Sequence, residues 1–242
     1  MTPLVLVHGF MGGSAQWDGQ CDAFANGRKV IAVDLPGFGA LAHLPAINRI
    51  QDFADWVIAD LQAKGVARYH LLGHSMGGMI AQEIARKDSA RVARLVLYAT
   101  GASGVLPGRF ETIAQSKSRA VADGAPATAR RIAATWFLDG TEAPGYEACA
   151  DIAEQASLDA ILAGLDAMEA WTGTARLADI SAETMIIWGD QDRTYAWEQI
   201  DRLWRDIPST HLAVVPGCAH AVHLEKENYF NALLTDFVDL QA

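Results

Sequence analysis

The stretch Gly73-His74-Ser75-Met76-Gly77 decides the fold, because it lies between a strand-like run and a helix-like run. The apolar run from Tyr69 to Leu72 is typical of a buried strand, and Met79 to Lys87 is typical of a helix. A serine on so sharp a turn needs a strained backbone, and side chains two positions to either side would collide. We therefore expect Ser75 to stand clear of a sheet, over the positive end of the following helix.

A serine hydroxyl needs a base before it can act as a nucleophile, and the base needs an acid that orients it. The strand-like run Thr184 to Trp188 is followed by Asp190 and Asp192. Another such run, His211 to Val215, is followed by His220. Both candidate groups thus follow the carboxyl ends of strands, where doubly wound sheets place their ligands and catalytic groups. The sequence predicts that serine, aspartate and histidine meet at one edge of the sheet.

A glycine-rich loop precedes all of these groups. The strand-like run Leu4 to Val7 leads into His8 to Gly13, whose backbone N–H groups are available to a developing oxyanion. The chain has neither a G-x-x-x-x-G-K-[ST] nor a G-x-G-x-x-G pattern, so a nucleotide site is not predicted.

Taken together, these motifs resemble those of the α/β-hydrolase superfamily over nearly the whole chain. The segments that carry the resemblance are His8-Gly9-Phe10, Asp34-Leu35-Pro36-Gly37-Phe38-Gly39, Gly73-His74-Ser75-Met76-Gly77-Gly78, Gly189-x-x-Asp192 and Gly217-x-x-His220. The resemblance implies that Ser75 is the nucleophile, His220 the base and Asp192 the acid. It also implies that the backbone N–H groups of Phe10 and Met76 form the oxyanion hole.

The implied architecture is the α/β-hydrolase fold, a mostly parallel sheet flanked by helices. Strand-like and helix-like runs alternate through residues 1–102 and 179–242, which we assign to one α/β-hydrolase core. The alternation stops over residues 103–178, where Ala-rich helical runs are broken by Gly and Pro, and this stretch is predicted to be a helical cap. The resemblance places the cap after the sixth family strand. The chain departs from the family pattern at its start: the His-Gly strand begins close to Met1, so we expect the N-terminal hairpin of the family to be truncated here.

Two of the implied roles have competitors in the sequence. Asp190 follows its strand directly and competes with Asp192 for the role of the acid, although the family spacing favours Asp192. His223 lies about one helical turn beyond His220 and competes for the role of the base. We favour His220 and expect His223 to be a pocket-wall or packing residue.

The composition limits the partners. The net charge is −10, which predicts repulsion from nucleic acid and from anionic membranes. The three cysteines are scattered, so neither a disulfide framework nor a zinc site is indicated, and no metal or organic cofactor is expected. No signal peptide and no membrane-spanning run is recognised, so the expected location is cytoplasmic and the expected partner is a small molecule. The sequence carries no signal for an oligomeric state.

The predicted cap supplies candidate pocket residues. We expect the substrate pocket to include Trp136, Phe137, Trp171 and His223. Further candidates are the apolar Phe110 and Met168 and, as anchors for a substrate carboxylate, Arg109, Arg119, Arg130, Arg131 and Arg176. The alternative for each of these arginines is a place on a solvated helix face.

The resemblance is to serine hydrolases such as 3-oxoadipate enol-lactonases and small carboxylesterases. It implies cleavage of a small carboxylic ester or lactone through an acyl-enzyme. Carbon–carbon bond hydrolases of ring-fission diketones remain an alternative, but they typically have asparagine and tryptophan where this chain has His74 and Ala221. A non-catalytic small-molecule receptor of the same fold is a second alternative, which the complete set of Ser75, Asp192 and His220 disfavours.

Overall fold

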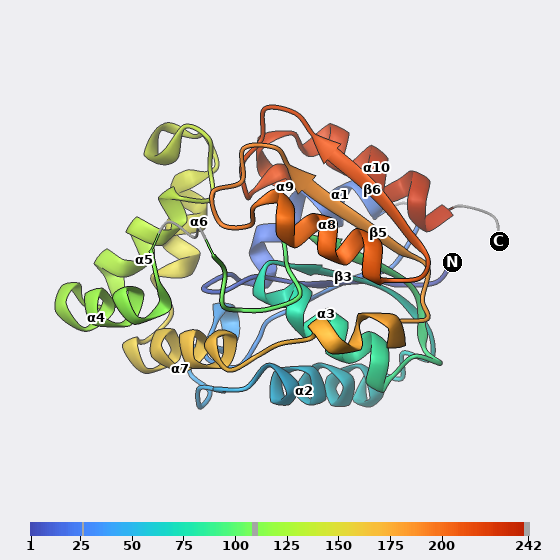
Figure 1. The fold of residues 1–242 in the computed structure, drawn as a ribbon, viewed down its shortest axis with the longest axis horizontal. Helices are drawn as coiled ribbons and strands as arrows, with labels where there is room; N and C mark the ends of the chain where they lie inside the picture. The colour runs from blue at the N-terminus through green and yellow to red at the C-terminus, as the bar shows by residue number, and fades with distance from the viewer. Residues whose placement is uncertain (26, 108–110, 240–242) are drawn as a thin grey trace.

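The computed structural model describes residues 1–25, 27–107 and 111–239. Within them, six parallel strands form one sheet in the order β2-β1-β3-β4-β5-β6 (Figure 1). The strands are β1 Leu4–Val7, β2 Val30–Val33, β3 Tyr69–His74, β4 Val92–Tyr98, β5 Thr184–Gly189 and β6 Thr210–Val215. This is the parallel sheet that the alternation of the sequence predicted.

Helices cover both faces of the sheet. One face packs against α2 (Ile50–Ala63), α3 (Met76–Lys87) and α8 (Trp197–Asp206). The other face packs against α1 (Asp18–Phe24) and α10 (Glu227–Asp239). The remaining short helices of the core are η1 Ser14–Trp17, η2 Gly39–Leu41 and α9 Val222–Glu225. None of the helices in the described ranges is both long and apolar enough to cross a membrane.

Strand alternation divides the hydrophobic core into two clusters. In β1, Val5 and Val7 face the cluster that contains α2 and α3, whereas Leu4 and Leu6 face the cluster that contains α1 and α10. All four side chains are fully buried. The period of two along the strand therefore produces a sheet with apolar side chains on both faces, which is why its strands read as continuous apolar runs.

The chain between β4 and β5 is helical, as residues 103–178 were predicted to be. It contains α4 Ile113–Asp123, α5 Ala125–Ala134, η3 Gly140–Glu142, α6 Tyr146–Ala153, α7 Leu158–Glu169 and η4 Thr174–Asp179. Figure 1 shows α4 to α7 grouped at one end of the sheet, beyond the points of the strands. We call residues 103–178 the helical insertion.

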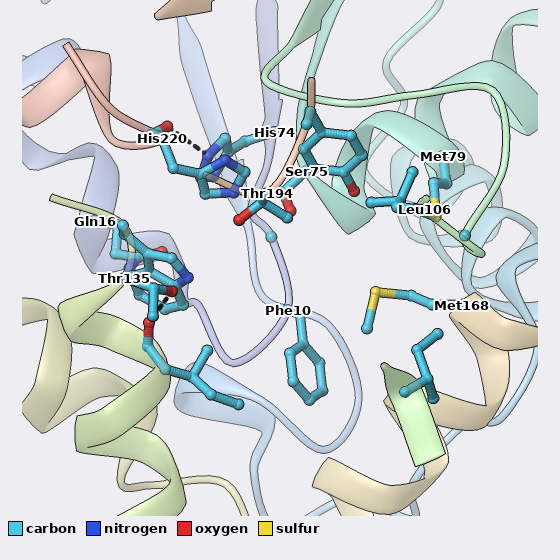
Figure 2. Close-up of a pocket in the computed structure, with 16 residues that line it drawn as sticks. Phe10, Gln16, His74, Ser75, Met79, Leu106, Thr135, Met168, Thr194 and His220 are labelled. Atoms are coloured by element: carbon cyan, nitrogen blue, oxygen red, sulfur yellow. Dashed lines mark hydrogen bonds between the residues drawn. The ribbon is translucent and has the colours of Figure 1, made fainter. Parts of the chain in front are cut away.

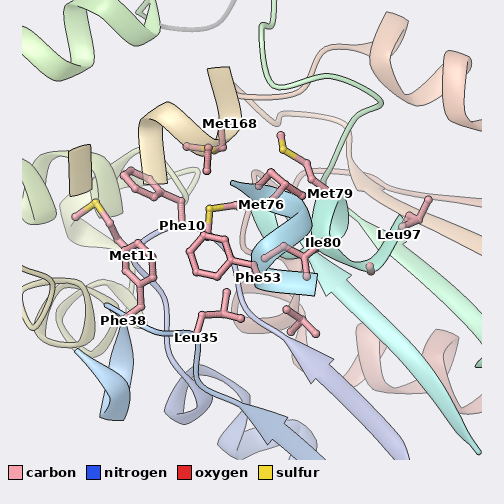
Figure 3. Close-up of a cluster of buried hydrophobic side chains, with 14 of the residues drawn as sticks. Phe10, Met11, Leu35, Phe38, Phe53, Met76, Met79, Ile80, Leu97 and Met168 are labelled. Atoms are coloured by element: carbon pink, nitrogen blue, oxygen red, sulfur yellow. The ribbon is translucent and has the colours of Figure 1, made fainter. Parts of the chain in front are cut away.

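The two ends of the helical insertion are fastened to each other. An isolated antiparallel bridge joins Ser103 to Thr172, and the Gly104 N–H donates to the carbonyl oxygen of Trp171 at 3.1 Å. Figure 3 shows that Met168 of α7 approaches a cluster of apolar side chains that includes Phe10 and Met76 of the core. The insertion and the sheet thus share one hydrophobic core.

The elements extend beyond the runs from which they were predicted. Strand β3 continues through Gly73 and His74, and α3 begins at Met76, so Ser75 alone connects them. Helix α9 was not predicted, because its four residues are too short to show a periodicity.

The connection between β3 and α3 brings backbone segments into close contact. A Cβ atom on Gly73 would lie 2.2 Å from the carbonyl oxygen of Gly77. A Cβ atom on Gly77 would lie 2.4 Å from the carbonyl oxygen of Val7 in β1. Because these neighbours are backbone atoms, they cannot rotate away, and the turn requires glycine at both positions.

We predict that Gly73→Ala lowers the free energy of unfolding by about 3 kcal/mol or more, because the added methyl group overpacks the turn. The matched control is Gly27→Ala, where no described atom beyond the chain neighbours lies within 4 Å of the added Cβ, and its change should stay within about 0.5 kcal/mol. Urea-induced unfolding followed by circular dichroism measures both. Equal stability of the two variants would contradict the described turn.

Candidate active site

Ser75 occupies a strained turn at the carboxyl end of β3. Its backbone has φ 55° and ψ −118°, which is unusual for a residue other than glycine. Its N–H donates to the carbonyl oxygen of Tyr98 at 2.9 Å, and its own carbonyl oxygen accepts from the Thr100 hydroxyl at 2.7 Å. The neighbouring strand β4 and the residues after it therefore hold the turn in place.

His220 and Asp192 meet although 28 residues separate them in the chain. The Nδ1 atom of His220 lies 2.8 Å from Oδ2 of Asp192, whose side chain is fully buried. The second carboxylate oxygen, Oδ1, accepts from the N–H groups of Thr194 at 2.7 Å and Tyr195 at 3.2 Å. With both oxygens hydrogen-bonded, the carboxylate orients the imidazole, so that Nδ1 carries the proton and Nε2 has a free lone pair.

The competing carboxylate has a different position. Asp190 accepts a hydrogen bond from the Gly217 N–H at 2.7 Å and so braces the loop that follows β6. The structure therefore brings Asp192, and not Asp190, to the imidazole of His220.

The backbone around His220 is held from several sides. Its carbonyl oxygen accepts from the hydroxyl of Tyr98 at 2.9 Å and from Nε2 of His74 at 3.2 Å. The phenol ring of Tyr195 stacks on the imidazole with ring centres 5.7 Å apart. His220 is thus fixed at its backbone and on one face of its ring.

Hydrogen bonds also join this loop to the helical insertion. The Glu225 carboxylate accepts from the Ala219 N–H at 2.7 Å and from the Leu138 N–H at 2.6 Å. The Ala221 N–H donates to the carbonyl oxygen of Trp136 at 2.9 Å. One carboxylate therefore bridges the His220 loop and the segment that follows α5.

His223 is buried behind the site and does not line the cavity. Its Nδ1 lies 3.0 Å from the Tyr98 hydroxyl, and its ring packs against Trp17 with centres 4.5 Å apart. Burial is the main cause that lowers the pKa of His223 to about 3, so this imidazole is neutral at physiological pH. His74, which does line the cavity, also has its pKa held well below the usual value by burial and by the nearby His220 and His223.

The loop after β1 approaches the serine closely. A Cβ atom on Gly9 would lie 3.0 Å from Cβ of Ser75. His8 shapes the loop, because its Nδ1 lies 2.8 Å from the Gly9 carbonyl oxygen while its Nε2 accepts from the Leu35 N–H at 3.1 Å. No described group accepts a hydrogen bond from the N–H of Phe10 or of Met76. Both donors thus remain available, and Met76 is also the first residue of α3.

Ser75 and His220 line one cavity beneath the helical insertion (Figure 2). Its free volume is about 40 Å³, which suits a small ligand. The described residues that line it are Gly9, Phe10, Gln16, His74, Ser75, Met79, Gly104, Leu106, Ile113, Ile132, Thr135, Trp136, Met168, Thr194, Tyr195 and His220.

The structure brings only some of the expected pocket residues to this cavity. Trp136 and Met168 line it, whereas Phe137, Trp171 and His223 do not. Trp171 turns toward α3, where its indole N–H donates to Glu83 at 2.9 Å, and Phe137 is buried against Gly145. Phe110 and Arg109 lie outside the described residues.

Polar lining residues such as Gln16, Thr135 and Thr194 were missed by the sequence analysis. They belong to a short 3-10 helix, a helix end and a loop, and no periodicity indicates where such side chains point.

The other four candidate arginines form ion pairs with carboxylates away from the cavity. Arg130 contacts three of them, and Arg176 contacts Asp179 at 2.7 Å. Arg119 and Arg131 both contact Glu111, at 3.3 and 2.8 Å. Among the lining residues that the structure describes there is neither arginine nor lysine. The same described part of the chain has no cluster of three His, Cys, Asp or Glu side chains that could hold a metal ion.

Comparison with known proteins places this geometry in a family. The chain is 29% identical over 262 residues to the 2-hydroxy-6-oxononadienedioate/2-hydroxy-6-oxononatrienedioate hydrolase of Burkholderia vietnamiensis, covering 97% of this chain and 86% of that protein. It is 42% identical over 103 residues to the dihydrolipoyllysine-residue acetyltransferase component of the acetoin cleaving system of Pseudomonas putida. That match spans 43% of this chain but only 28% of that relative.

The fold is similar to that of the enol-lactonase from Burkholderia xenovorans. The TM-score is 0.89 at 21% identity, with 99% of this chain and 92% of that chain covered. A family model described as the alpha/beta hydrolase family matches residues 4–232. The parallel sheet, the serine turn at the end of β3 and this match together show that the chain belongs to the alpha/beta hydrolase family.

Proposed function

We propose that the protein hydrolyses a small, uncharged carboxylic ester or lactone through an acyl-enzyme on Ser75. One observation carries the proposal: Ser75 and His220 line the same cavity, while the far side of the imidazole is held by the buried Asp192 carboxylate at 2.8 Å. This arrangement leaves Nε2 of His220 free to take the serine proton.

The reaction has two steps. Ser75 attacks the substrate carbonyl while His220 accepts its proton, and the N–H groups of Phe10 and Met76 stabilise the negative charge on the oxygen. His220 then protonates the leaving group. In the second step His220 activates a water molecule, which releases the acid and restores the serine. The carboxylate of Asp192 stabilises the positive imidazolium in both steps.

The cavity favours a small substrate without charge. The free volume of the cavity, about 40 Å³, limits the size of the substrate. The described lining residues include no cationic side chain, and the four described candidate arginines are already paired with carboxylates. A substrate carboxylate would therefore be buried without a counter-charge, which is costly.

A carbon–carbon bond hydrolase is the second candidate, because the relative from Burkholderia vietnamiensis carries the name of one. The same three catalytic side chains serve both reactions. A panel of p-nitrophenyl esters, lactones and vinylogous diketones separates the two functions. We expect turnover of the esters and lactones, whereas turnover of the diketones alone would favour the second candidate.

We predict that Ser75→Ala lowers kcat for p-nitrophenyl acetate by roughly 10⁴-fold or more and blocks labelling by a fluorophosphonate probe. The reason is that no other described hydroxyl stands on a strained turn beside a base. Steady-state kinetics and gel fluorescence of the purified variant measure both effects. Full activity in the variant would exclude Ser75 as the nucleophile.

We predict that His220→Ala loses about as much activity as Ser75→Ala, because members of a catalytic triad act as one unit. His223→Ala should lose far less, because His223 is buried behind the site and contacts Tyr98 and Trp17. Kinetics on p-nitrophenyl acetate, with circular dichroism to verify folding, compare the two variants. If folded His223→Ala lost more activity than His220→Ala, the assignment of His220 as the base would be wrong.

A further inference from the structure

The walls of the catalytic cavity differ in chemistry from one side to the other. Figure 2 shows Gln16 and Thr135 on one side of Ser75, and Met79, Leu106 and Met168 on the other. All five line the same cavity. A substrate that fills it must therefore present a polar part to the first side and an apolar part to the second.

Gln16 is a buried amide whose hydrogen-bonding capacity is only partly used. Gln16 is only 7% exposed to solvent. Its Nε2 donates to the thiol of Cys149 at 3.4 Å, a weak acceptor, and no described group donates to its Oε1. Most buried polar groups are hydrogen-bonded, so an amide left in this state within a cavity indicates a ligand that completes its bonding.

The short helix that carries Gln16 is held in place by the core. It lies in η1, whose first residue Ser14 donates twice to Asp34, from its N–H and from its hydroxyl, both at 2.8 Å. Because this backbone is already ordered, less entropy is lost when the Gln16 amide binds a partner.

Thr135 offers a complementary acceptor from the helical insertion. Its hydroxyl donates to the carbonyl oxygen of Ile132 at 2.7 Å, so its lone pairs alone are available to a ligand. Together, Gln16 and Thr135 provide acceptors and one amide donor. That combination matches a hydroxyl group, which both donates and accepts, and does not match an anion.

The position of His220 decides which part of the substrate meets this polar side. His220 protonates the oxygen of the leaving group, so the alcohol part of an ester must lie on the same side as His220. In Figure 2, His220 lies on the side of Gln16 and Thr135, away from Met79, Leu106 and Met168.

From this arrangement we infer that Gln16 and Thr135 form a subsite for a hydroxylated, uncharged alcohol, esterified to a short apolar acid that lies against Leu106 and Met168. The inference rests on the proposed ester hydrolysis and names the substrate class of that same site.

Two esters of the same acid test the subsite. The pair is 2-hydroxyethyl butanoate and propyl butanoate, which differ by a hydroxyl in place of a methyl group. The natural protein should favour the hydroxyethyl ester in kcat/KM by about tenfold, the size expected for one or two hydrogen bonds between uncharged groups. Because an apolar site would favour the propyl ester, a ratio above one reports these bonds.

Variants assign the preference to residues. Gln16→Leu and Thr135→Val should each bring the ratio closer to one. Gln155→Leu changes an exposed glutamine and is the matched control, which should keep the ratio of the natural protein. Met168→Ala should alter the preference between butanoate and octanoate esters and leave the hydroxyethyl-to-propyl ratio unchanged.

Three results would overturn the subsite. The first is an equal kcat/KM for both esters in the natural protein. The second is a preference that Gln16→Leu and Thr135→Val both leave intact. The third is a preference for a hydroxyl on the acyl part, measured with methyl 4-hydroxybutanoate against methyl pentanoate, that Gln16→Leu abolishes. Failure to hydrolyse any ester, together with no fluorophosphonate labelling, would contradict the proposed function itself and the subsite with it.

Discussion

The sharp reversal of the chain at Ser75 is the constraint on which the rest of the structure depends. A strand and a helix meet there with a single residue between them, and that residue has a positive φ of 55°. The reversal is possible only because Gly73 and Gly77 leave room for backbone atoms that lie within 2.5 Å of where their Cβ atoms would be. The strain is balanced by the hydrogen bond that Ser75 donates to Tyr98 in β4, by the one that it accepts from Thr100, and by the packing of α3 on the sheet.

Parallel strands convert this local geometry into a site. Because β3, β5 and β6 run in the same direction, the residues that follow them arrive at one edge of the sheet. Ser75, Asp192 and His220 each take that position after a different strand. The spacing of the strands determines how far apart these three residues lie, and short hydrogen-bonded loops orient each side chain.

Those parts of the molecule that depend on periodicity or on backbone constraints could be predicted from the sequence. Alternation predicted the parallel sheet, and glycines beside Ser75 predicted the strained turn. Whether a side chain faces a cavity is a different kind of question, because an aromatic residue is apolar in both settings. Trp136 lines the cavity, while Trp171 packs against α3 and donates to Glu83, and nothing in the local sequence distinguishes the two.

The polar lining could not be predicted for a related reason. Gln16 lies in a four-residue 3-10 helix that begins at Ser14. The orientation of this helix is set by a hydrogen bond from Ser14 to Asp34, which lies twenty residues further along the chain. Such a contact is long-range and has no spacing that a sequence pattern would reveal. Positions of this kind are determined only when the whole core has formed.

The carboxylate of Glu225 has a thermodynamic consequence for the helical insertion. It accepts hydrogen bonds from the N–H groups of Leu138 and Ala219 at the same time, and so ties the insertion to the His220 loop. Lifting the insertion at Leu138 would remove part of the support of His220. The position of the insertion at Leu138 and the position of the His220 loop are therefore coupled, and by reciprocity each stabilises the other by the same free energy.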